Sequence, residues 1–107
     1  MEFKLTDNPA YGTCLQGYFR ASFLQLKNVL EEPNGETDEY KVSTEWILEN
    51  EYGDIVTVYD YKSTKTYDSD LPSVEQFRKF NTYNWHIGAK EKNIAESFIN
   101  WLTDKIK

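Results

Sequence analysis

The chain has 107 residues, with 12 basic and 18 acidic side chains, so its formal net charge is −6. The single Cys14 cannot close an intrachain disulfide, and with His86 it supplies too few ligands for a closed Cys/His zinc site. The short apolar runs exclude a membrane-spanning helix and a signal-peptide core, and an aromatic content of 16% argues against disorder. These features predict one soluble globular domain over residues 1–107, in a reducing intracellular compartment.

Residues 13–19 and 22–30 predict a strand followed by a short helix. The strand segment is rich in strand-compatible residues, and Gly17 within it marks a bulge or a close backbone approach. Ser22 and Gln25 have the spacing of a capping box, which opens a helix. One helical face then carries the apolar residues Phe23, Leu26 and Leu30.

The next segment predicts an antiparallel hairpin. Residues 40–48 alternate between an apolar face with Tyr40 and Trp46 and a polar face, which is typical of a half-buried strand. A turn over 51–54 leads to the β-branched and aromatic run 55–62, which pairs back on the first strand. Residues 63–67 predict a third strand at an exposed edge.

The last third of the chain predicts a short helix, a short strand and a second main helix. Ser73 and Gln76 are spaced to cap one or two helical turns, and residues 85–88 indicate a short strand. Residues 91–106 carry an apolar stripe at helical spacing. The expected fold is therefore α+β, an antiparallel sheet of four to five strands with two main helices on one face.

No catalytic motif emerges from this pattern. A Cys14–His86 pair would need a nucleophile with a depressed pKa beside its base, and nothing in the sequence brings the two together. We expect His86 to be structural or superficial and Cys14 to be a packed thiol. Asp68 and Asp70 have the spacing of a cation loop without the rest of its pattern, and the five glycines form no phosphate loop. We therefore expect no enzyme, no metal and no cofactor.

The aromatic residues allow a different function. Tyr59, Tyr61 and Tyr67, with Trp46 and Trp85, could form a pocket that sequesters a nucleotide or another small ligand by stacking. Strand alternation instead places Trp46 in the core, and Trp46, Tyr59 and Trp85 could form one aromatic cluster there. Both readings stay open at this point.

The charge is concentrated in one part of the chain. From Glu31 to Asp70 there are twelve acidic residues and three lysines, a net charge of −9, whereas the remainder carries +3. Such a segment repels a nucleic-acid backbone and attracts a protein with a basic surface, although it could also serve only solubility. The candidate contact residues are Glu45, Glu49, Glu51, Asp54 and Asp60.

Several short blocks, in this order across residues 14–102, give the chain a family resemblance. They are Leu15-Gln16-Gly17-Tyr18, Ala21-Ser22, Pro33-Asn34, Tyr40-Lys41-Val42-Ser43, Glu45-Trp46, Thr57-Val58-Tyr59-Asp60-Tyr61-Lys62 and Trp85-His86-Ile87-Gly88. With them the chain resembles a widespread group of small bacteriophage and large-virus proteins. The resemblance implies a viral accessory protein in the host cytoplasm and brings no catalytic residues.

Together, the charge and the resemblance predict a non-enzymatic binder or inhibitor of a host protein with a basic surface. It could act as a nucleic-acid mimic or an anti-defence factor, with no direct contact to nucleic acid or membrane.

Overall fold

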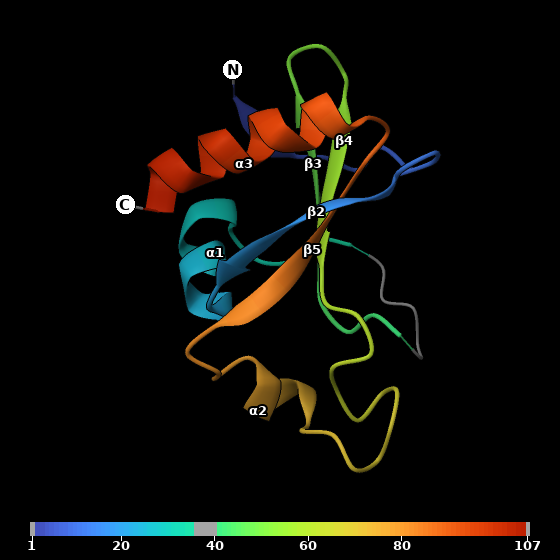
Figure 1. The fold of residues 1–107 in the computed structure, drawn as a ribbon, viewed down its shortest axis with the longest axis vertical. Coiled ribbons are helices and arrows are strands. Elements are labelled where there is room, and N and C mark those ends of the chain that lie inside the picture. The colour runs from blue at the N-terminus through green and yellow to red at the C-terminus, as the bar shows by residue number, and fades with distance from the viewer. Residues whose placement is uncertain (1, 36–40, 107) are drawn as a thin grey trace.

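Among the residues that the structure describes, five antiparallel strands form a single sheet in the order β1-β3-β4-β5-β2, accompanied by three helices (Figure 1). The structure is a computed structural model that describes residues 2–35 and 41–106. Along the chain the elements are β1 (Phe3–Leu5), β2 (Cys14–Ala21), α1 (Phe23–Leu30), β3 (Glu45–Asn50), β4 (Ile55–Tyr59), α2 (Val74–Phe77), β5 (Tyr83–Ala89) and α3 (Lys92–Ile106). The predicted α+β fold is confirmed.

One face of the sheet is covered by helices and holds the core. The helix α3 crosses β2, β5 and β4 and also contacts α1 (Figure 1). Beneath them the indole rings of Trp46 and Trp85 meet edge to face with centroids 5.5 Å apart, and Phe3 meets Phe98 at 5.0 Å. All four of these side chains are buried, so apolar burial is the main stabilising force on this covered face.

The opposite, open face carries polar and aromatic side chains. Register pairs Glu45 with Tyr59 and Tyr59 with His86, and it pairs His86 with Tyr18 on the outer strand β2. Because side chains alternate along a strand, these residues share the face that Trp46 and its neighbours avoid. The polar and aromatic side chains that could contact a partner therefore lie on the open face.

Local sequence signals account for the element boundaries. Ser22 and Ser73 each accept a hydrogen bond from the backbone three residues on, and Gln25 and Gln76 return one, so both predicted capping boxes are formed. In β2 the register shifts between Leu15 and Gly17, and a Cβ on Gly17 would lie 3.4 Å from Cδ1 of Ile99 on α3. The glycine thus serves both the bulge and the close approach of the helix.

The observed strands differ from the expected ones in the following details, and one strand was not expected. Residues 63–67 form turns instead of a strand, because the amide of Tyr67 donates to the carbonyl of Thr64. Strand β3 begins at Glu45, and the residue Tyr40 of the expected strand lies outside the described residues. The strand β1 was not expected, since three residues are too few to show a pattern.

Candidate functional site

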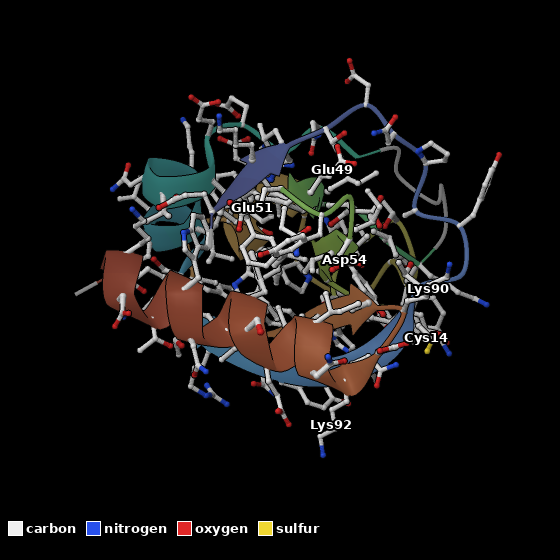
Figure 2. All side chains as sticks on the ribbon, turned by 90° about the horizontal axis from the view of Figure 1, so that it is seen from above. Cys14, Glu49, Glu51, Asp54, Lys90 and Lys92 are labelled. Carbon is white, nitrogen blue, oxygen red and sulfur yellow. The ribbon has the colours of Figure 1, made fainter. Side chains whose placement is uncertain are left out.

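The five acidic residues predicted as contacts occupy four different environments. Glu49 and Glu51 lie on the β1 side of the β3–β4 hairpin, whereas Asp54 lies across its turn toward Lys90 (Figure 2). Glu45 lines a neighbouring hollow, and Asp60 is buried. Four of the five residues are therefore at least partly accessible, whereas Asp60 is not.

Glu49 and Glu51 converge on one hollow of about 440 Å³ beside β1. Glu2 and Lys4 also line it, so three acidic residues and one lysine line the same space, which we call the acidic hollow. The Glu2 carboxylate also lies 3.8 Å from Nζ of Lys105 and accepts a hydrogen bond from Nε1 of Trp101 at 3.1 Å, and exposed contacts of this kind contribute little free energy. The hollow has the charge and the size to receive a cationic side chain.

The strand register brings these carboxylates together. Lys4 of β1 is paired directly with Glu49 of β3, and Glu51 follows β3 at the start of its turn. The Glu49 carboxylate is held in place, because it accepts hydrogen bonds from Oγ1 of Thr6 at 3.0 Å and from Nδ2 of Asn8 at 3.0 and 3.1 Å. Glu51 is exposed. The hollow therefore combines a positioned carboxylate with an accessible one.

Glu45 extends the acidic region along β3. It lines a second hollow, of about 470 Å³, together with Asp7. On this side the β3 edge is covered by Asn34, whose Nδ2 donates to the carbonyl of Ile47 at 3.1 Å and whose Oδ1 accepts from its amide at 2.8 Å. Glu45 thus lies beside the acidic hollow without being part of it.

Asp54 belongs to the turn rather than to a binding surface. Its Oδ2 accepts from Nδ2 of Asn50 at 3.2 Å, and its own amide donates to Oδ1 of Asn50 at 3.0 Å. Gly53 completes the turn with φ at 81°, a left-handed value that glycine adopts without strain. Lys90 lines the same small hollow as Asp54, so a cation is already near this carboxylate.

Asp60 is a correction to the sequence-based expectation. It is fully buried, and its carboxylate accepts hydrogen bonds from the amides of Ser43 at 2.9 Å and Thr44 at 2.8 Å and from the Ser43 hydroxyl at 2.7 Å. Its side chain follows the end of β4 and is enclosed by residues 43 and 44. Asp60 anchors the entry to β3 and cannot contact a partner.

His86 lies at the centre of a ring cluster on the open face. The rings of Tyr18, Tyr59 and Tyr61 lie with centroids 5.1, 5.3 and 5.8 Å from the imidazole, and Tyr59 is stacked on it. Burial lowers the pKa of His86 from its ordinary value of 6.5, and the nearby Asp60 charge acts in the opposite direction. The buried Nδ1 makes no hydrogen bond within the described residues. We find no nucleophile hydrogen-bonded to it there.

The cysteine environment differs from the expectation of a packed thiol. Cys14 is exposed at the start of β2, its Sγ accepts from Nε2 of Gln16 at 3.2 Å, and it lies 3.8 Å from the carbonyl of Ala89. None of these contacts involves His86.

The proposed aromatic pocket is divided between the two faces. Trp46 and Trp85 are buried on the covered face, so they are not accessible to a ligand, and Tyr59 joins His86 instead of the tryptophans. The ammonium of Lys62 lies 5.1 Å from the centroid of the Tyr67 ring. The expected Trp46–Tyr59–Trp85 cluster is therefore wrong with respect to Tyr59.

Within residues 2–35 and 41–106, no group of three or more His, Cys, Asp or Glu side chains is arranged to hold a metal ion. In the Asp68–Asp70 loop, Oδ1 of Asp68 accepts from the amide of Asp70 at 2.9 Å, which closes a local turn. No helix in the described part of the chain combines the length and apolar character of a membrane span.

Comparison with known proteins gives no family: no protein-family model and no curated protein matches the chain. The functional assignment therefore depends on the residues themselves.

The sequence did not indicate Glu2 as part of the site. It lies outside the acidic segment in the chain and enters the hollow only because β1 pairs with the last residues of β3.

Proposed function

We propose that this protein is a non-enzymatic binding protein that uses its acidic hollow to engage a basic surface of a host protein. The observation that carries the proposal is the convergence of Glu2, Glu49 and Glu51 on one hollow. A lysine or arginine side chain of the partner would exchange water for these carboxylates, and Arg in particular matches carboxylate geometry.

The charge around the acidic hollow also favours a basic partner. Glu45 and Asp7 line the adjacent hollow, so the acidic region continues beyond the hollow itself. Exposed charges of this kind steer association and select partners more than they add affinity. The same charges disfavour direct binding of nucleic acid, whose phosphates are anionic.

The resemblance to small phage and large-virus proteins supports a host protein as the partner and the host cytoplasm as the place. A protein that handles nucleic acid has a basic groove, so occupation of that groove by this chain would block it by imitating phosphate charge. This makes a nucleic-acid mimic or an anti-defence factor the specific form of the proposal.

The test compares charge variants that differ in location only. Wild type, Glu51→Lys and Glu96→Lys are immobilised and used to capture proteins from a bacterial lysate, then eluted with rising salt. Glu51 lies in the hollow and Glu96 lies on the exposed side of α3, so both substitutions change the net charge equally.

We expect a basic protein that wild type and Glu96→Lys retain and that Glu51→Lys loses. Its affinity should fall at least about tenfold with Glu51→Lys, because opposed like charges cost several kcal/mol. It should also weaken steeply between about 0.1 and 1 M salt, where the Debye length falls from about 10 to 3 Å. Equal retention by all three proteins would contradict the proposal.

A second candidate function is stacking of a flat ligand on the open face. It is favoured by Tyr18 and Tyr61, which are 50% and 39% exposed and flank His86. A thermal-shift screen with nucleotides tests it, since a ligand at one hundred times its Kd adds about 2.7 kcal/mol of stability. Tyr61→Ala should remove any such shift, and a shift that persists in this variant would place the ligand elsewhere.

A further inference from the structure

A groove between α1 and α2 lies apart from the acidic hollow and has the opposite character. It has a volume of about 760 Å³, within the usual range of small-molecule sites. In Figure 1, α2 lies toward the end of the molecule away from the hairpin turn, and α1 lies between α2 and α3. Apolar side chains of Phe23, Leu24, Val74 and Phe80 line it.

Two of these apolar side chains are exposed to solvent. Leu24 is 60% exposed and Phe80 is 45% exposed, and both line the same groove. Exposed apolar side chains that gather in one concave place mark a binding surface more often than isolated ones do. The groove can therefore take up an apolar body of limited size.

The charges at the groove are cationic, although the chain as a whole is acidic. Lys27, Arg78 and Lys79 line it, against the single carboxylate of Glu75. Lys27 pairs with Glu32 at 3.0 Å and Lys79 pairs with Glu75 at 3.7 Å, and all four side chains are substantially exposed. Exposed pairs of this kind are weak, so both ammonium groups can turn to a bound anion.

The guanidinium of Arg78 is positioned at the groove by contacts with Phe23 and Thr44. Its guanidinium lies 4.6 Å from the centroid of the Phe23 ring, and its Nε and Nη2 donate to the hydroxyl of the buried Thr44 at 3.2 and 3.1 Å. Nη1 has no hydrogen-bond acceptor among the described residues. The ring contact and the hydrogen bonds position the guanidinium, which reduces the entropy lost when a carboxylate binds.

From these observations we infer that the α1–α2 groove binds a small amphipathic carboxylate, with its apolar body on Phe23, Leu24 and Phe80 and its carboxylate on Arg78. Lys27 and Lys79 add attraction for the same charge. The site is independent of the acidic hollow, whose charge has the opposite sign, so either function can fail without the other.

The experiment uses two probes of the same shape. 2-Naphthylacetate carries the carboxylate and 2-naphthylacetamide replaces it with a neutral amide. Both are titrated into ¹⁵N-labelled protein while backbone amide shifts are recorded. We expect saturable shifts at Phe23, Leu24 and Arg78, with the carboxylate binding about tenfold more tightly than the amide, because hydrogen bonds to a charged group are stronger.

Two arginine variants test whether Arg78 causes the preference for the carboxylate probe over the amide probe. Arg78→Gln should make the two probes bind equally, whereas Arg20→Gln, a loss of the same charge on the exposed part of β2, should leave the tenfold difference unchanged. Since Arg78 also supports Thr44, a third variant guards against loss of the fold. Leu24→Glu alters an exposed helix position and should abolish carboxylate binding.

Three results would overturn the proposal. They are the absence of saturable shifts in the groove, equal affinity of wild type for the two probes, and undiminished carboxylate binding by folded Leu24→Glu.

Discussion

The two faces of the sheet are stabilised in different ways. On the covered face Trp46 and Trp85 are almost completely buried, and full burial of a large apolar side chain is worth about 1.5–3 kcal/mol. On the open face the hydrogen bonds that Glu49 accepts from Thr6 and Asn8 are part-buried and exposed, so water can replace them and each contributes about 1 kcal/mol. The fold thus depends mainly on one face, so most substitutions on the other can test binding without unfolding the protein.

The largest expected effect comes from comparing two carboxylates, one buried and one on the open face. Asp60→Ala leaves the amides of Ser43 and Thr44 without their buried acceptor, and should lower the free energy of unfolding by about 3 kcal/mol. Glu49→Ala, whose partners can turn to water, should cost less than about 1 kcal/mol. Urea unfolding followed by circular dichroism measures both. Equal losses would remove the distinction between the two environments.

An intermediate effect is expected where the open face is itself closely packed. A Cβ on Gly88 of β5 would collide with the hydroxyl of Thr57, its paired residue on β4, so Gly88→Ala should destabilise by about 2 kcal/mol. Thr57→Ala removes the obstructing oxygen. In the double variant the loss should be clearly smaller than the sum of the two single losses. Strict additivity would show that the contact is not the cause.

The smallest expected effect is the pH dependence from His86. Because burial lowers its pKa in the folded state, the unfolded chain binds the proton more tightly. The contribution of His86 to the free energy of unfolding is fully present above the unfolded pKa of 6.5 and declines as the pH falls below that value. The urea midpoint should therefore drop between pH 7.5 and 5.5, and less so in His86→Gln. An identical drop in both proteins would exclude His86 as the source.

The features that could be predicted from the sequence are those that depend on residues close together in the chain. The spacings from Ser22 to Gln25 and from Ser73 to Gln76 located both helix starts, and alternation around Trp46 assigned the covered face of β3. These signals work because caps and periodicity involve residues close together in the chain.

What the sequence missed depends on contacts between distant residues. Glu2 lines the same hollow as Glu49 only because β1 pairs with β3, and Asp60 is buried because residues 43 and 44 fold onto it. The groove likewise forms from Leu24 and Phe80, more than fifty positions apart, so no spacing could indicate it.

The exposed thiol of Cys14 gives the protein a natural attachment point for a reporter. It is the only cysteine in the sequence, and Thr13 beside it lines the small hollow next to Asp54. At the far end of β2, Ser22 lines the α1–α2 groove, roughly 25 Å away at about 3.3 Å per residue. A maleimide dye can therefore be attached at Cys14 without engineering a cysteine, and it would lie too far from the groove to contact a small ligand bound there.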